Sequence, residues 1–405
     1  MRKVILMLSF LSFVNSNAQD LPKEIEEFKI SALPYYNYGK GLGMTSADSL
    51  FQLNLRFRMQ NRASFYNNES RDDNFDAQIR RLRLRFDGYV GNPQFQYAIQ
   101  LSFAPGDVGE IKDGEDLNII RDAVVTYKPN KHWNFLFGQT KLPGNRQRVN
   151  SSGSLQLTDR SINNAMFNID RDFGFQIYYL EESNNKFAYN IKTAVSSGNG
   201  RNWSGKDTKP ALTGKIELYP FGNFKSGGEY FEGDIKYEET PKLMISGVYH
   251  NNFGANLSRG QQGDNLFNPI EMSSVFVDMV AKYKGWAAMF AYMNRNSNNP
   301  ITYQMDSNNN LINSYAFVGH GTDYQLSYTF NNHYEIIGRY SNQKVDDKIF
   351  KLNQPNQQQF SLGLTKYIWE HAFKIQGEIS YDKLEYFGGL KNNNWYARFQ
   401  IEIGI

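Results

Sequence analysis

The sequence lacks cysteine and contains few histidines. Having no Cys among 405 residues excludes a disulfide scaffold, a thiol nucleophile and Cys-ligated zinc or iron–sulfur centres. No Ser–acid pair or metal-ligand spacing surrounds the five histidines, which are His132, His250, His320, His333 and His371. We therefore predict no catalytic residues, no metal site, no cofactor and no enzymatic activity.

A charge excess and long apolar runs are also missing. The chain has 44 Lys plus Arg against 41 Asp plus Glu, so its net charge does not point to nucleic acid. No internal stretch approaches the roughly 18 apolar residues of a membrane-spanning helix. A mean hydropathy of −0.59 is also too polar for a bundle of such helices. The 15% of aromatic residues excludes disorder over most of the length.

The N-terminus has the pattern of an export signal. Arg2 and Lys3 precede an apolar core at 4–14, and a small-x-small site follows at 16–18. This pattern predicts a signal peptide over residues 1–18, without a lipoprotein anchor. Its removal leaves 42 basic against 41 acidic residues. Residues 19–48 lack strand periodicity, and we predict a periplasmic extension there, with a loop-like run at 35–41.

From residue 49 onward, apolar and polar residues alternate with a period of two. The pattern is clear at 51–60, 94–103, 373–381 and 395–405. Such segments, about 9–11 residues long, can cross a bilayer as tilted strands.

The connections between these segments alternate between short and long. Short turns fall near 91–93, 129–131, 182–185, 284–285, 331–332 and 369–370, with a longer one at 220–241. Long polar loops fall near 66–77, 105–118, 142–168, 196–210, 252–272, 296–320, 344–357 and 383–393. The pattern predicts an all-β, transmembrane, antiparallel up-and-down barrel of about 16 strands over 49–405, with short periplasmic turns and long extracellular loops. Counting 231–239 as a strand would give seventeen.

Aromatic residues at the strand ends favour a membrane barrel over a soluble β-sandwich, lectin or solenoid, which is the alternative reading. They would form the two interfacial girdles, and they are Phe51, Tyr89, Trp133, Tyr178, Tyr219, Trp286 and Trp395.

The polar faces of the first two strands are rich in arginine. If the apolar faces contact lipid, the polar faces line the lumen. Six arginines then converge on one wall: Arg56, Arg58, Arg62, Arg81, Arg83 and Arg85. Guanidinium groups bind carboxylate and phosphate oxygens, so the wall would attract anions and pass them between weak sites. The alternative is a structural wall neutralised by acids such as Asp159, Asp170 or Asp172.

The loop at 142–168 is the longest connection. A long loop early in such a barrel could fold inward and narrow the pore, or it could be an ordinary external loop. As a constriction loop it would contribute Arg146, Arg148, Asp159 and Arg160.

Three motifs resemble those of the phosphate-selective porin O and P family of outer-membrane proteins. They are Arg-Arg-Leu-Arg-Leu-Arg-Phe-Asp-Gly at 80–88, Gly-Gln-Thr-Lys-Leu-Pro at 138–143 and Glu-Ile-Ile-Gly-Arg-Tyr-Ser at 335–341. Their order and spacing fit over residues 45–405. The resemblance implies a sixteen-stranded barrel, a homotrimer and an arginine ladder, and it adds Lys141 to the residues that line the pore.

We therefore expect an outer-membrane porin that passes small anions or polar solutes by passive diffusion, with outer-membrane lipid around it. Phosphate and polyphosphate are the solutes that the resemblance suggests. A non-selective diffusion porin and a barrel scaffold of a secretion or assembly complex are the alternatives.

Overall fold

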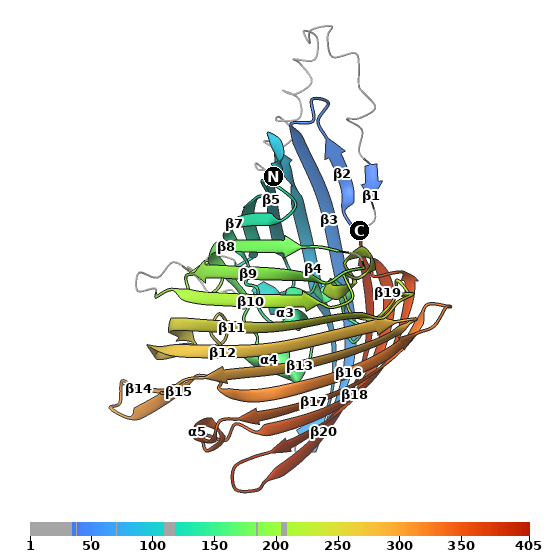
Figure 1. Cartoon of the computed structure of the whole chain (residues 1–405). Coiled ribbons are helices and arrows are strands. Elements are labelled where there is room, and N and C mark those ends of the chain that lie inside the picture. The colour runs from blue at the N-terminus through green and yellow to red at the C-terminus, as the bar shows by residue number, and fades with distance from the viewer. Residues whose placement is uncertain (1–34, 38, 70, 109–117, 184, 204–208) are drawn as a thin grey trace, which may run out of the picture.

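The period-two segments form long antiparallel strands (Figure 1). The computed structural model describes residues 35–37, 39–69, 71–108, 118–183, 185–203 and 209–405. In this part of the chain, sixteen strands pair in sequence order, and the last closes the ring on the first, with Asn394 opposite Asn68 and Gly404 opposite Arg58. The predicted sixteen-stranded barrel is confirmed. The barrel strands are β3 (Phe51–Asn68), β4 (Arg71–Val90), β5 (Asn92–Ser102), β6 (Ile120–Tyr127), β7 (Trp133–Lys141), β8 (Arg171–Glu181), β9 (Ala188–Ser196), β10 (Ala211–Tyr219), β11 (Lys242–Leu257), β12 (Asn265–Tyr283), β13 (Trp286–Asn296), β16 (Gly319–Thr329), β17 (Tyr334–Val345), β18 (Asn356–Trp369), β19 (Phe373–Glu385) and β20 (Lys391–Gly404).

Shorter elements lie in the connections. None of the helices in the described residues is long and apolar enough to cross a membrane. The segment 221–240 contains no strand, so the alternative of seventeen strands is wrong. These elements are β1 (Tyr35–Asn37), β2 (Gly41–Thr45), α2 (Pro105–Val108), α3 (Arg146–Val149), η3 (Ser152–Ser154), α4 (Ile162–Phe167), η4 (Lys225–Tyr230), β14 (Ile301–Met305), β15 (Leu311–Tyr315) and α5 (Asp347–Phe350).

Several predicted loops are in fact paired strands. The hairpin β3–β4 continues to Asn68 and Arg71, so most of the loop expected at 66–77 is strand. The same holds for large parts of 252–272 and 383–393. An antiparallel pair can extend beyond the bilayer, where its outward side chains become polar and the apolar alternation that marks a strand is lost.

The described part of the N-terminal extension is a β-hairpin, so the loop-like interpretation of residues 35–41 is wrong. Strand β2 pairs with β3 from Leu42 opposite Leu55 to Thr45 opposite Gln52. Strand β20 ends opposite Arg58, so this stretch of β3 would otherwise expose an unpaired edge. The predicted signal peptide and residues 19–34 lie outside the described residues.

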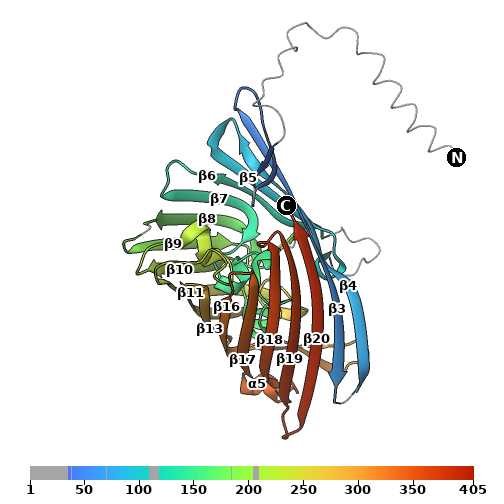
Figure 2. The ribbon, with the colours of Figure 1, turned by 90° about the vertical axis from the view of Figure 1, so that its right-hand side faces the viewer.

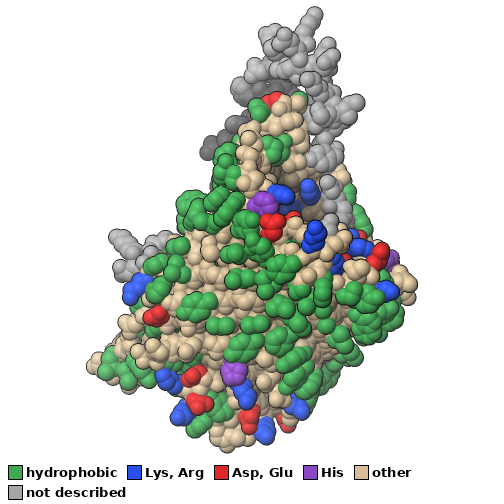
Figure 3. Space-filling model, in the orientation of Figure 1, with side chains coloured by type: hydrophobic (Ala, Val, Ile, Leu, Met, Phe, Trp, Pro, Cys, Tyr) green, Lys and Arg blue, Asp and Glu red, His purple; other side chains and the backbone are tan. Residues whose placement is uncertain are grey.

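On the face shown in Figure 3, hydrophobic side chains cover much of the middle of the barrel, and charged groups gather mainly at the bottom and at the upper right. Trp133, Trp286 and Trp395 lie on the outer face of the barrel, as predicted. The prediction is wrong for Tyr178 and Tyr219. Each follows an inward residue by two positions, so strand alternation turns it into the lumen, where its hydroxyl group donates to Gln176 and Glu217, respectively.

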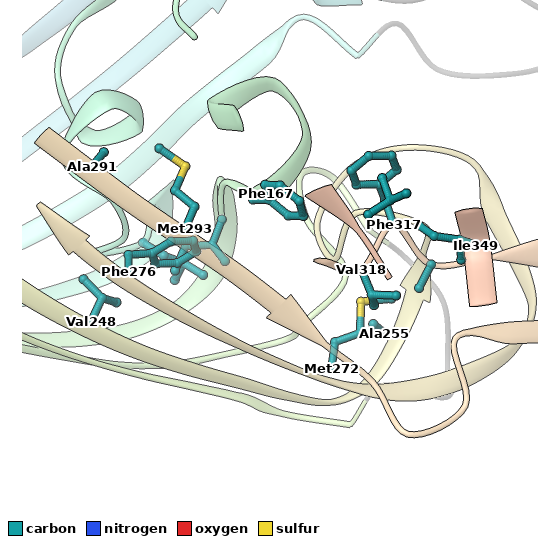
Figure 4. Close-up of a cluster of buried hydrophobic side chains, with 14 of the residues drawn as sticks. Phe167, Val248, Ala255, Met272, Phe276, Ala291, Met293, Phe317, Val318 and Ile349 are labelled. Carbon is teal, nitrogen blue, oxygen red and sulfur yellow. The ribbon is translucent and has the colours of Figure 1, made fainter. Parts of the chain in front are cut away.

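The connection between β7 and β8, residues 142–170, lies inside the ring of strands (Figure 2), and we call it the loop insert. It hydrogen-bonds to walls on opposite sides of the lumen, for example to Arg58 through Ser152 and to Asp278 through the Arg146 backbone N–H. Phe167 of α4 joins a buried apolar cluster with Phe276 and Met293 of β12 and β13 (Figure 4). This packing holds α4 against the inner wall at β11–β13.

Candidate functional site

The arginines of β3 and β4 stand opposite one another on the inner wall. Arg56 is opposite Arg85, and Arg58 is opposite Arg83. Like charges directly across an antiparallel pair destabilise it, so each pair needs carboxylates, water or anions nearby.

Carboxylates at the short-turn end are shared between arginines. Asp87 accepts from Arg85 Nε at 3.0 Å and also pairs with Arg56. Arg58 lies 3.7 Å from Glu402 and donates to the hydroxyl groups of Ser151 and Ser152 in the loop insert. The wall thus keeps more guanidinium groups than carboxylates.

Asp159 of the loop insert holds three arginines. Its carboxylate lies 3.2 Å from Arg62, 2.8 Å from Arg80 and 2.9 Å from Arg81. Burial alone would raise the pKa of Asp159, but the three guanidinium groups hold it well below its usual range. Asp159 therefore carries its charge throughout the physiological range and joins the loop insert to β3 and β4.

Asp107, after β5, holds two more arginines. It accepts from Arg83 Nε at 3.0 Å and lies 2.8 Å from Arg121 Nη1. Against the opposing effect of burial, these two charges also hold the pKa of Asp107 far below its ordinary value.

Two β-bulges direct additional arginines inward. The register of β3 and β4 shifts between Gln60 and Asn61, and it leaves Arg80 without a partner on β3. The register of β5 and β6 shifts between Gln100 and Leu101 and leaves Arg121 without a partner on β5. A bulge breaks strict alternation, so two consecutive polar side chains can face the lumen at each place.

Strands β7 and β8 and the loop insert supply further cations. Arg171 donates to both oxygens of Asp122, each at 3.0 Å, and Arg148 donates to Asp170 at 2.7 Å. Among the described residues, the hydrogen bonds of the Lys141 ammonium and the Arg160 guanidinium go to backbone carbonyls of the loop insert.

Two cavities lie along this charged region. The turn-side cavity has a volume of about 520 Å³ and contains one acidic side chain, Asp122, among its lining residues. Its cationic lining residues are Arg56, Arg58, Arg83, Arg85, Lys141 and Arg171. The loop-side cavity has a volume of about 290 Å³ and also contains one acid, Asp107. Its cationic lining residues are Arg80, Arg81, Arg83, Arg121, Lys141, Arg148, Arg160, Arg171, Arg201 and Arg259.

Arg83, Lys141 and Arg171 line both cavities and therefore lie where the two meet. They come from β4, β7 and β8. An anion that moved from one cavity to the other would have to pass these three cations.

Most of the sequence-predicted site residues line one of these cavities, but three do not. Arg62 and Asp159 are engaged with each other beside the loop-side cavity. Arg146 points toward the opposite wall, where its guanidinium donates to the carbonyls of Glu229 and Phe231. Asp172, suggested as a neutralising acid, instead accepts from Ser197 and from backbone N–H groups.

The sequence analysis did not identify five of the lining arginines. Arg80 and Arg121 lie at bulges, next to the inward Arg81 and Asp122. Strict alternation assigns consecutive residues to opposite faces, so it places Arg80 and Arg121 on the outer face. Arg171 comes just after the predicted loop at 142–168, and Arg201 and Arg259 lie within the polar loops predicted at 196–210 and 252–272, where no periodicity shows which side chains face the lumen.

Residues 51–216 match the model of the family described as phosphate-selective porin O and P. This stretch carries two of the three motifs and most of the inner arginines. No curated protein sequence matches the chain significantly.

Solved structures of outer-membrane porins share the fold. The outer membrane channel DcaP of Acinetobacter baumannii has a TM-score of 0.56 at 16% identity, covering 90% of this chain and 99% of that one. OmpF of Salmonella typhi has a TM-score of 0.56 at 12% identity, covering 89% and 100%. An anion-selective porin from Comamonas acidovorans has a TM-score of 0.51 at 11% identity, covering 87% and 99%. Residues 51–216 thus match this family, and the barrel as a whole has the fold of outer-membrane porins.

Proposed function

We propose that the chain passes small anions by passive diffusion through the two cavities. The observation that carries this proposal is the meeting of Arg83, Lys141 and Arg171 between cavities that contain one acidic side chain each. Guanidinium and ammonium groups attract anions, and several adjacent weak sites let an ion enter and leave. Phosphate and polyphosphate are the candidate solutes, because their oxygens match paired guanidinium groups.

Single-channel recording in a planar bilayer with a KCl gradient tests the proposal. The expected result is open steps with a reversal potential that shows anion preference, and a current that added phosphate reduces. The substitutions Arg83→Gln and Lys141→Gln should lower the anion preference while the barrel stays folded. Arg398→Gln is the matched control, because Arg398 is packed on Tyr396 and lines neither cavity.

The other outcomes correspond to the two alternative functions. Open steps without anion preference would indicate a general diffusion porin. Folded protein without conductance would indicate a scaffold subunit of a secretion or assembly complex.

We also propose that the chain is exported through a signal peptide at 1–18 and assembles as a homotrimer. The outer face supports the second point. Two apolar hollows of about 740 and 620 Å³ lie side by side on the outer face, the first over β12–β19 and the second over β17–β20, β3 and β4, where Gly338 and Gly377 lack side chains. Gly338→Trp should reduce the trimer seen by native mass measurement, whereas Gly214→Trp, on another outward site with open space, should not.

The proposed cleavage of the signal peptide is tested by mass. The exported protein should have the mass of a chain that begins at Gln19.

A further inference from the structure

One connection at the short-turn end does not resemble the others. Residues 220–241, between β10 and β11, form a long irregular segment that we call the turn insert. Glu229, Glu232, Asp234 and Glu238 are each at most 5% exposed. Acidic side chains so deeply buried mean that the middle of this segment lies within the molecule, while its ends, such as Lys225 and Glu239, stay exposed.

Backbone carbonyls of the turn insert accept hydrogen bonds from cations in the lumen. Lys282 Nζ of β12 donates to the carbonyls of Gly228 at 2.6 Å and Phe231 at 3.0 Å. Arg146 of the loop insert donates to the carbonyls of Glu229 at 2.8 Å and Phe231 at 2.7 Å.

The turn insert is also attached to three neighbouring short turns. Asp234 accepts from the Gly285 backbone N–H at 2.8 Å, and the Tyr237 hydroxyl donates to the Thr329 carbonyl at 2.8 Å. Lys236 forms an ion pair with Glu370. These contacts span the β12–β13, β16–β17 and β18–β19 connections.

The two inserts meet inside the barrel. The Glu232 N–H donates to the Ser154 carbonyl at 3.0 Å, and the Glu232 carboxylate accepts from the Gln156 N–H at 3.0 Å. Gln156 in turn donates to Glu335 of β17 and accepts, at its carbonyl, from Thr365 of β18. Loop insert, turn insert and the β17–β18 wall therefore form one hydrogen-bonded layer.

This layer separates the cations of the lumen into two groups. On the β10–β19 side, Lys215, Lys282 and Lys374 donate to insert carbonyls. No described residue of strands β9 to β19 lines either charged cavity. On the β3–β8 side, most of the cations border the cavities, and Arg201 and Arg259 of the β9–β10 and β11–β12 connections join them at the loop-side cavity. Phe231 marks the boundary, because its ring lies 5.4 Å from that of His371, which lines the turn-side cavity.

We propose that the turn insert closes the β9–β19 half of the lumen at the short-turn end and thereby confines anions to the arginines of β3–β8. The proposal rests on the proposed function, because it names the element that sets the width and the charge selectivity of that passage. Without the insert, the lumen would have a second path beside a wall that carries both signs of charge, including Glu217, Asp278 and Glu335.

The first test replaces residues 222–241 by Asn-Gly. Leu218 is opposite Ile245, so continuing this register by three residues brings 221 opposite 242, where a two-residue turn fits. The conductance should rise about twofold or more, since it follows the cross-section of the passage, and the anion preference should fall. Glu239→Gln, in the exposed Lys225–Glu239 pair of the same segment, is the control that should change neither.

A second test does not depend on the deletion variant. The protein has no cysteine, so a single introduced thiol can be labelled selectively. Ala287 is buried on the inner face of β13 next to Lys282, while Gln100 lines the turn-side cavity. A charged methanethiosulfonate should block the current through Gln100→Cys and leave Ala287→Cys unaffected. Adding Asp234→Ala and Phe231→Ala, which loosen the insert, should make the thiol of Ala287→Cys reactive.

The outcomes separate this proposal from the proposed function. Wild-type channels without anion preference would contradict the proposed function. Anion-selective wild-type channels whose conductance and selectivity persist in the folded deletion variant would overturn the role of the turn insert. Rapid block of Ala287→Cys in the otherwise unchanged protein would overturn it as well.

Discussion

At the scale of single residues, Asp159 holds three guanidinium groups that would otherwise repel one another. Asp159→Asn removes the shared acceptor of Arg62, Arg80 and Arg81. Removing one partner of a fully buried pair costs about 3–5 kcal/mol, and the cost here should be smaller because the Asp159 side chain is 25% exposed. We expect a lower midpoint of barrel unfolding on heat-modifiability gels and a noisier current. Asp306→Asn, in the exposed β14–β15 turn, is the control, and equal effects of the two would contradict this role.

The pKa of Asp159 also determines how acidification acts. A carboxylate with a depressed native pKa stabilises the fold above its unfolded value, about 3.9, and loses that contribution only as the pH falls through the native pKa. Lowering the pH from 7 to 5 should therefore not reproduce the effect of Asp159→Asn. A drop in midpoint at pH 5 in the wild type that is absent from the Asn variant would show that Asp159 titrates in this range.

At the scale of elements, helix α4 depends on a glycine of the facing wall. Asn163 of α4 donates to the Thr322 carbonyl at 3.0 Å and to Asp323 at 2.8 Å. A Cβ on Gly321 would lie 1.9 Å from Asn163 Oδ1. Gly321→Ala should therefore displace α4 at a cost of about 1–3 kcal/mol, typical of overpacking. The measurement is the thermal midpoint together with the conductance.

A matched substitution separates this effect from strand propensity. Gly214 of β10 also lies in a strand but faces outward, and a Cβ there would meet nothing within 4 Å. Gly214→Ala should leave both the midpoint and the conductance unchanged. Equal changes in the two variants would contradict the idea that Gly321 makes room for α4.

The local geometry of these elements also explains why the sequence predicted only part of the site. Period-two alternation gives the strand number and the inward direction of Arg56, Arg58, Arg83 and Arg85, because every residue of a regular strand obeys it. The inward direction of Arg80 depends on a bulge that exists only relative to the partner strand. The turn insert has no periodicity at all, and its place is set by contacts such as those with Gly285 and Glu370, which lie 51 and 134 positions away.

At the scale of the whole molecule, two inserts that start at opposite ends of the barrel meet within it. The loop insert starts from the long-loop end and the turn insert from the short-turn end, and Glu232 joins them. Insert carbonyls and carboxylates such as Glu217 accept from the cations of the β9–β19 half of the lumen, while the cavities of the other half are lined by more cations than acids. The selectivity of the proposed channel is thus a property of the assembled barrel rather than of one strand.

A selectivity that arises from this excess charge must depend on ionic strength. Ten cationic residues border the loop-side cavity, and one acid does. Their combined potential extends about 10 Å at 0.1 M salt but only about 3 Å at 1 M. We expect the anion preference, from reversal potentials at a fixed KCl ratio, to decrease toward unity as the mean concentration rises over this range. The decrease should be shallower with Arg83→Gln and Lys141→Gln. A preference independent of salt in the wild type would instead mean that direct contact or pore size selects the solute, since short-range contacts are screened far less than a long-range potential.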